Sequence, residues 1–217
     1  HLQLRQQPLL TFISIGTLDG EYYAASQPPI GDDKSVRIIE ATNANDRLIR
    51  IYQADDLGRK TELMSLGNSH FDARTRPWFR SAILSGVVQW YPVYRYVIRV
   101  IDGVYDTLGM GMASIIRNAA QEPVGVIASD VALSQVNEFL AKYMSRLKGI
   151  AFIAEQPSHE LMASSSTEPT FFFSGEQTLR VTISESGNPV IRAVGRAMEA
   201  SNNAEGSQFI QVDDDRY

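Results

Sequence analysis

The sequence contains no cysteine among its 217 residues. Disulfides, thiol catalysis and cysteine-ligated metal sites are therefore excluded together. Histidine is scarce as well: His1, His70 and His159 lie far apart, and no pair has the spacing of a metal site. No apolar run reaches the roughly 18 residues that a membrane-spanning helix needs. We expect no metal or cofactor, and we expect any membrane anchor to lie outside this stretch of sequence, which starts at His1 without a signal peptide.

Clustered positive charge is also missing. Lys and Arg total 20 against 25 Asp and Glu, which gives a net charge of -5. This balance argues against a nucleic-acid partner and against docking on anionic lipid. The serine-hydrolase elbow, the zinc-protease motif and the glycine-rich dinucleotide fingerprint do not occur. What remains is a composition with 44% hydrophobic and 21% charged residues, typical of a globular protein that needs no disulfide or metal to stabilise its core.

Short apolar segments separated by turn residues dominate the first half of the chain. Turn signals such as Asp19-Gly20 bound strands that we predict at residues 9–16, 21–26, 36–41 and 48–53. The polar stretch Leu57 to Asp72 is predicted to be a long loop, and loops of this kind often bind ligands.

Pro77 suits the first position of a helix, so Trp78 to Leu84 is predicted as a short helix that Gly86 ends. Further strands are predicted at residues 88–95, 96–101, 109–117 and 124–130. Apolar residues at intervals of three and four then predict an amphipathic helix over Leu133 to Leu147.

The last third has a different character, and we place a boundary near Lys148. Beyond it we predict a strand at 150–154, a loop at 158–169, a helix at 190–200 and a strand at 209–212. The predicted organisation is therefore the end of a stalk helix (1–8), a first module (9–148) and a shorter, truncated second module (149–217).

The segment Phe71 to Phe79 carries the clearest chemical signal. Two arginines and a tryptophan flank the start of the predicted helix, whose free N–H groups and positive dipole end favour an anion. A planar guanidinium beside them suits a carboxylate held by two parallel hydrogen bonds. The alternative is structural: an arginine that pairs with Asp72 and a tryptophan that belongs to the core.

These residues resemble a known family. Asp72-x-Arg74-x-Arg76-Pro77-Trp78-Phe79 is similar to the D-x-R-x-R-P-W-Y signature of double-Cache sensor domains. About 45 residues later, 125–133 (Gly-Val-Ile-Ala-Ser-Asp-Val-Ala-Leu) resembles the family's strand G-V-V-G-V-D-I-S-L, which a helix follows. The resemblance covers residues 9–147, and residues 148–217 only by expected position.

The resemblance implies an α+β fold with two PAS-like (Cache) modules, whose antiparallel sheets pack along a long N-terminal helix that ends at residues 2–7. It implies a periplasmic or extracellular sensing domain of a dimeric transmembrane receptor, and no enzyme. A histidine kinase, a cyclase or a chemotaxis signalling domain would lie in the cytoplasm. The ligand would be an amino acid, an amine or a carboxylate. The matching site residues are Phe71, Arg76, Trp78, Phe79, Tyr91, Tyr94 and Asp130.

In this scheme Arg76 meets the ligand's carboxylate, Asp130 meets its amine, and the Leu57–Asp72 loop closes over them. Two departures widen the choice of ligand. Phe71 and Phe79 stand where the amino-acid-binding pattern has tyrosine, and Ser81 stands where a carboxylate is common. Two other functions stay open: a hydrolase that uses Asp72 with Asp130, and a structural or protein-binding ectodomain with a vestigial pocket.

Overall fold

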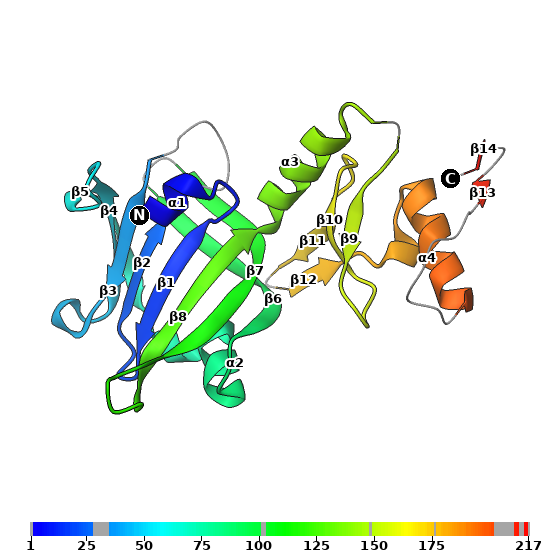
Figure 1. Cartoon of the computed structure of the whole chain (residues 1–217). Helices are drawn as coiled ribbons and strands as arrows, with labels where there is room; N and C mark the ends of the chain where they lie inside the picture. The colour runs from blue at the N-terminus through cyan, green and yellow to red at the C-terminus, as the bar shows by residue number, and fades with distance from the viewer. Residues whose placement is uncertain are drawn as a thin grey trace. The chain divides into compact units, whose positions relative to one another are not determined.

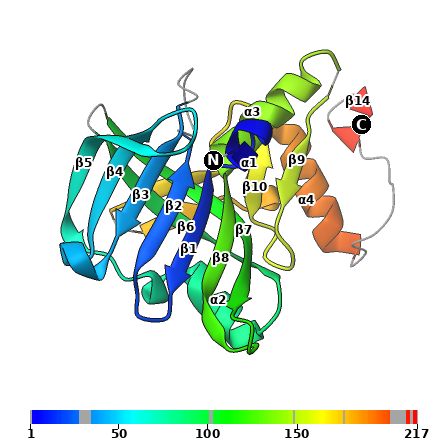
Figure 2. The ribbon, with the colours of Figure 1, turned by 60° about the vertical axis from the view of Figure 1, so that its left-hand side comes forward.

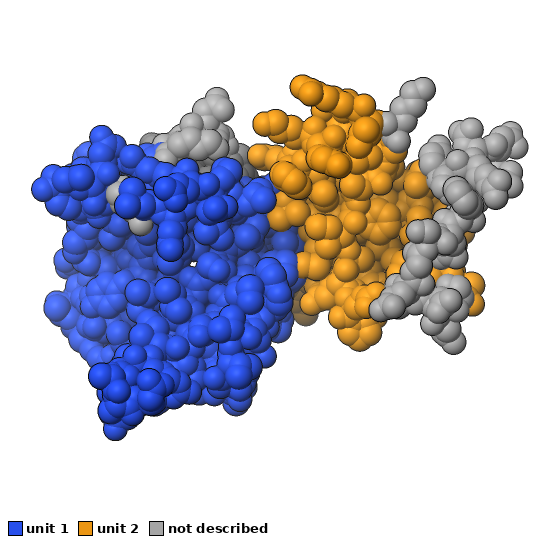
Figure 3. Space-filling view, viewed as in Figure 1, with its two compact units in different colours: residues 1–135 blue, residues 136–217 orange. Residues whose placement is uncertain are grey.

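The computed structural model describes residues 2–27, 35–100, 103–147, 149–175, 177–201, 211–212 and 215–216 (Figure 1). The chain divides into two compact units, residues 1–135 and 136–217 (Figure 3). The division lies near the start of helix α3 (Leu133–Met144). Lys148, where the sequence places the boundary, lies outside the described residues.

One eight-stranded sheet forms the framework of the first unit, and all its neighbouring strands are antiparallel. This confirms the predicted α+β class. The sheet order is β5-β4-β3-β2-β1-β8-β7-β6. The strands are β1 (Phe12–Thr17), β2 (Tyr22–Ser26), β3 (Arg37–Ala41), β4 (Leu48–Ala54), β5 (Lys60–His70), β6 (Gln89–Val100), β7 (Gly103–Arg117) and β8 (Pro123–Ala132). The edge strands β5 and β6 contact each other, so the sheet curves strongly (Figure 2).

Helices cover both faces of this sheet. On the inner face, helix α2 (Pro77–Ser85) and the 3-10 turn Ala73–Thr75 contribute Ala73, Trp78 and Phe79 to the main core. As predicted, α2 begins at Pro77, and Gly86 follows it in the left-handed conformation. On the outer face, Leu4 of α1 (Leu2–Gln6) is fully buried against a second apolar cluster. Residues 2–6 are thus helical, within the helix end predicted at residues 2–7.

Short side chains on the inner face leave room above the middle of the sheet. The strand register places seven residues in one row across seven strands, and the middle of the row is occupied by small side chains. In order, this floor row consists of Ala113, Ala128, Ser14, Ala24, Ile39, Ile51 and Ser65. Because alanine and serine fill little volume, the space above Ser14 and Ala24 is not filled from the sheet itself.

Gly16 allows α2 to approach the sheet. A Cβ at this position would lie 2.7 Å from the side chains of both Ala73 and Trp78. Atoms do not pack at that distance, so any larger residue would push the helix away. Glycine in β1 therefore fixes how close Trp78 lies to the strands.

The polar stretch 57–72 is a strand for most of its length, so the loop prediction is wrong. Strand β5 runs from Lys60 to His70 at the edge of the sheet. Its pairing with β4 breaks register in three places. Each break moves the following side chains to other faces, which destroys the period-two pattern by which a strand is recognised. The proposed closure of a Leu57–Asp72 loop over the ligand falls with this correction.

Two other predictions also need correction. The two segments predicted at 88–95 and 96–101 are joined in one strand, β6, over Gln89–Val100; residue 101 lies outside the described residues. The bulge between Tyr91 and Tyr94 accommodates Pro92, which an edge strand tolerates. In the second unit, the predicted loop 158–169 contains strand β10 (Leu161–Ser164).

The second unit contains three two-stranded sheets within its described residues. They pair β9 (Phe152–Ala154) with β10, β11 (Phe171–Ser174) with β12 (Gln177–Arg180), and β13 (Gln211–Val212) with β14 (Asp215–Arg216). The core of the second unit is formed by Leu161 of β10, by Ile183, and by Ile191 of helix α4 (Pro189–Ser201). None of the described helices is long and apolar enough to cross a membrane.

Candidate functional site

A cavity of about 490 Å³ lies between the curved sheet and the segment that leads into α2. Its walls are aromatic and aliphatic, with a few polar and charged side chains among them. This composition is typical of a small-molecule site. The lining residues are Phe12, Ser14, Tyr22, Ile39, Ile49, Ile51, Ser65, Leu66, Gly67, His70, Phe71, Arg76, Trp78, Tyr94, Arg95, Tyr96 and Asp130.

Arg76 provides the positive charge of one wall. It occupies the residue before α2, and its guanidinium lies 4.2 Å from the centre of the Phe71 ring. Its Nε atom is buried without a hydrogen-bond partner. A buried guanidinium donor that the protein leaves unpaired is costly, and a bound anion would satisfy it.

Asp130 provides a negative charge on another wall. It is 3% exposed, near the end of β8, and its carboxylate accepts a hydrogen bond from the Tyr91 hydroxyl. Burial raises the pKa of Asp130 from 3.8 to about 7, and the bond from Tyr91 opposes that rise. A cationic ligand would provide the charge partner that favours the ionised form.

Aromatic side chains connect the two charged walls. The Tyr22 ring packs on Phe71 at 4.5 Å and on Trp78 at 6.3 Å, while Tyr94 packs on Tyr96 at 5.9 Å. Burial raises the pKa of Tyr22, Tyr94 and Tyr96 above the ordinary value, so their hydroxyls remain protonated. The cavity therefore combines hydrogen-bonding hydroxyls with apolar ring faces.

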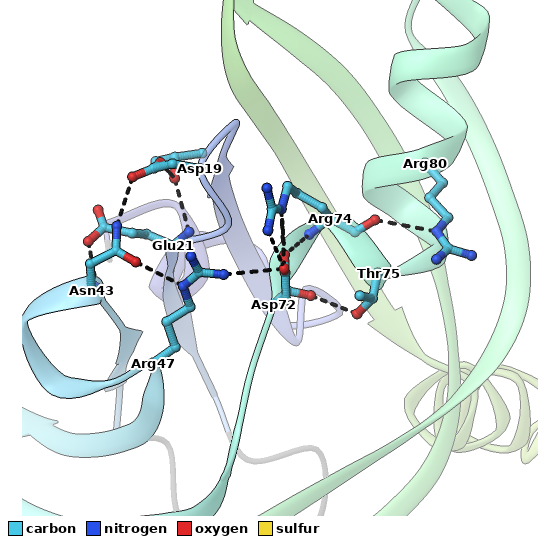
Figure 4. A network of polar contacts seen from close by, with 9 residues as sticks. Asp19, Glu21, Asn43, Arg47, Asp72, Arg74, Thr75 and Arg80 are labelled. Atoms are coloured by element: carbon cyan, nitrogen blue, oxygen red, sulfur yellow. Dashed lines mark hydrogen bonds and ion pairs between the residues drawn. The ribbon is translucent and has the colours of Figure 1, made fainter.

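Asp72 belongs to a separate, surface network (Figure 4). Its carboxylate pairs with Arg74 at 2.6 Å and with Arg47 at 3.2 Å, and it accepts the Arg74 backbone N–H at the start of the 3-10 turn. These donors, Arg74 first, lower the pKa of Asp72 to about 2. Asp72 does not line the cavity with Asp130. A hydrolase that uses these two carboxylates together therefore receives no support.

The sequence left open whether the arginines bind a ligand or only pair with Asp72. Arg74 pairs with Asp72, whereas Arg76 does not. The guanidinium of Arg74 forms an ion pair with Asp72 at the 3-10 turn, and the guanidinium of Arg76, two residues later, lines the cavity. Trp78 combines both expectations, since it is 2% exposed in the core and also lines the cavity.

The structure brings five of the seven predicted residues together on the cavity wall: Phe71, Arg76, Trp78, Tyr94 and Asp130. Tyr91 lies behind Asp130, as its hydrogen-bond donor. Gly111 makes room for this bond, because a Cβ there would collide with the Tyr91 hydroxyl and with the Ser129 carbonyl oxygen. Phe79 packs edge-on against Trp78 at 5.7 Å, 5% exposed in the core.

Sequence reasoning missed the cavity residues that the sheet contributes. Tyr22, Tyr96, Ser14 and the aliphatic residues of β3 and β4 stand on strands far from the motif. Only the period-two alternation of these strands could have indicated that Ser14 and Tyr22 point inward. Among the described residues, no group of three or more metal-ligating side chains is found.

No family model and no curated protein matches the chain. Solved structures do match. A methyl-accepting chemotaxis protein X has 13% identity and a TM-score of 0.47, with 96% of this chain and 69% of that chain covered. The ligand-binding domain of the Pseudomonas aeruginosa PAO1 amino acid chemoreceptor PctB, in complex with L-Arg, has 17% identity and a TM-score of 0.43, with 99% and 62% covered.

The ligand-binding domain of the amino acid chemoreceptor PctC from the same organism, in complex with GABA, has 13% identity and a TM-score of 0.38, with 75% of this chain and 54% of that chain covered. This chain therefore spans between 54% and 69% of the length of the three structures. All three identities are 17% or lower, and all three TM-scores lie below 0.5.

Proposed function

We propose that the chain is the extracytoplasmic small-molecule sensing part of a transmembrane receptor, and that the first unit binds an amino acid or a similar small ligand. One observation carries this proposal. Arg76 and Asp130, distant in sequence, line a single cavity, and within the described residues no salt bridge of the protein pairs either of them. Leaving two charges buried in this way costs free energy of folding, and a bipolar ligand would recover that cost.

The available contacts are sufficient for useful affinity. A charge-assisted hydrogen bond contributes about 1.5–3 kcal/mol, and micromolar binding needs about 8 kcal/mol. Two or three such bonds to Arg76 and Asp130, with apolar contact to Trp78 and Tyr94, reach that range. The rest of the receptor belongs to the same proposal: membrane anchors outside this sequence, a dimer, and a cytoplasmic output domain.

A structural ectodomain with a vestigial pocket is the second candidate function. It would be favoured by a cavity filled with the chain's own side chains, whereas about 490 Å³ here is unfilled. The small residues of the floor row maintain that space. We therefore favour the sensor.

The test is a thermal-shift screen of amino acids, amines and organic acids, followed by calorimetric titration of each hit. Arg76→Ala and Asp130→Ala should each weaken binding by at least about tenfold, the effect of one lost charge-assisted bond. Arg59→Ala and Asp56→Ala are matched controls, because these side chains are 72% and 94% exposed and do not line the cavity. A ligand that binds all four variants equally would contradict the site, and no hit from any class would contradict the sensor.

A further inference from the structure

We infer that Thr11 is a positioning residue that couples occupancy of the cavity to helix α3. The inference rests on the proposed function and adds how the occupied site acts on the rest of the chain. It comes from the buried hydrogen bonds that Thr11 makes with the end of β8 and with the first turn of α3.

Strand β8 continues into α3 without a loop. The strand ends at Ala132 and the helix begins at Leu133, so Asp130 lies three residues before the helix (Figure 1). Coupling between distant parts of a protein is carried by rigid elements that are packed or bonded together. Because no flexible segment separates Asp130 from α3, a shift of the strand end is not absorbed before it reaches the helix.

Thr11 holds this junction on both sides. Its backbone N–H donates to the carbonyl oxygen of Asp130 at 2.8 Å, and its hydroxyl oxygen accepts the N–H of Ala132 at 2.8 Å. The same hydroxyl donates to the side-chain oxygen of Gln135, in the first turn of α3, at 3.2 Å. Thr11 is fully buried and Gln135 is 9% exposed, so water cannot replace these bonds when one is lost.

Tyr96 brings the cavity to Thr11. Its ring lines the cavity and packs edge-on against Phe12 at 5.5 Å. Burial and the charge of Asp130 raise the pKa of Tyr96, and the Thr11 hydroxyl acts against that rise, so the two hydroxyls are neighbours. Within the described residues, the Tyr96 hydroxyl is buried without a hydrogen-bond partner.

The hydrogen-bonding capacity of the two hydroxyls makes them a switch. Thr11 gives its proton to Gln135 and one lone pair to Ala132, so one acceptor position remains for Tyr96. Tyr96 has a single proton, which it can donate to Thr11 or to a ligand in the cavity, but not to both. Since hydrogen bonds in a chain polarise one another, the choice made by Tyr96 changes the strength of the bond from Thr11 to Gln135.

The same helix is bonded to the sheet of the second unit. Two residues after Gln135, the side-chain oxygen of Asn137 accepts the backbone N–H of Ser164 in β10 at 2.8 Å. Gln135 belongs to the first unit and Asn137 to the second. Thr11 therefore holds the end of a helix that continues into the second unit.

Hydrogen exchange of the whole chain tests this coupling. The probe is the compound with the largest shift in the thermal-shift screen, added at saturation. In the wild-type chain we expect it to slow amide exchange in residues 136–144 of α3. In Thr11→Val, which keeps the shape but lacks the hydroxyl, and in Gln135→Met, which lacks the acceptor, this slowing should fall by about fivefold, the effect of one neutral hydrogen bond.

Two controls separate coupling from a purely structural role. Thr11→Ser retains the hydroxyl and should respond as the wild type does. Thr61→Val removes a hydroxyl that donates to the Gln53 carbonyl oxygen at 3.0 Å on the edge strand, and it should also respond normally. Strand β3, whose Ile39 lines the cavity, should be slowed in every variant and so reports that the cavity is filled.

A structural role alone would weaken binding but leave the response of α3 at saturation unchanged. An equal response in Thr11→Val and the wild type would therefore overturn the inference, as would a wild-type α3 that does not respond while β3 does. Both outcomes would leave the sensor intact. If Thr11→Val does not fold, Gln135→Met decides, because it keeps the bond to Ala132. If no compound of the screen binds, the proposed function itself fails, and the inference with it.

Discussion

Replacing Asp130 with Asn should stabilise the first unit, and the gain should grow with pH. The reason is the raised pKa of the buried carboxyl group. Below its ordinary value of 3.8, Asp130 is protonated in both the folded and the unfolded chain. Between 3.8 and about 7 the unfolded chain ionises while the folded one retains the proton, so stability falls as pH rises. Above about 7 both are ionised and the cost is complete.

The size of the effect follows from the same interval. Each pH unit between the two pKa values corresponds to about 1.4 kcal/mol. Asparagine has the same shape, carries no charge and can still accept the hydrogen bond from Tyr91. The stability gained by Asp130→Asn should therefore increase from about 2 kcal/mol at pH 5 to about 4 kcal/mol at pH 8. For a chain of this size, that increase corresponds to about 4–8 °C in Tm.

Urea unfolding followed by tryptophan fluorescence would measure this directly. Both tryptophans of the chain, Trp78 and Trp90, lie in the first unit, so the signal reports its unfolding. Asp56→Asn is the control, since its side chain is 94% exposed and does not line the cavity. A destabilised Asp130→Asn chain, or a gain that is the same at pH 5 and pH 8, would refute the reasoning.

Three further predictions follow from the same contacts. The affinity for a cationic ligand should fall by about tenfold per pH unit below 7, because Asp130 must lose its proton to bind the cation. Binding titrations from pH 5 to 8 would measure this fall in affinity. An affinity that does not change with pH would argue against contact between the ligand and Asp130. Tyr91→Phe removes the donor to Asp130, so it should weaken binding at neutral pH by about tenfold and move the midpoint of that profile upward, whereas a purely structural role would leave the midpoint unchanged. Gly16→Ala should destabilise the first unit by about 1–3 kcal/mol in urea, because its Cβ would overlap Trp78; no loss of stability would show that the helix is not held against β1.

Local signals were sufficient for the parts of the site that are close together in the sequence. Pro77 and Gly86 correctly bound α2, since their backbone preferences act without help from the rest of the fold. The motif around Arg76 and the strand-end Asp130 were predicted to share one cavity, and they do. The choice between Arg74 and Arg76 as partner of Asp72 needed coordinates, because both alternatives fit the same residue types.

Long-range pairing decided the rest. The irregular register of β5 is set by its bulged pairing with β4, which no local pattern in Lys60–His70 reveals. Similarly, the volume of the cavity depends on Ser14 and Ala24 standing side by side in the floor row, and that is a property of strand order. Tyr91 was predicted to touch the ligand but lies one layer further out, because the space left by Gly111 lets its hydroxyl reach Asp130.

A crystal structure of the chain grown with the tightest-binding amino acid from the thermal-shift screen tests the central claim most directly. The account predicts density inside the cavity, with the carboxylate on the Arg76 guanidinium and the ammonium on the Asp130 carboxylate, next to the Tyr91 hydroxyl. Density that touches neither side chain, or a cavity closed by the protein's own side chains, would contradict it.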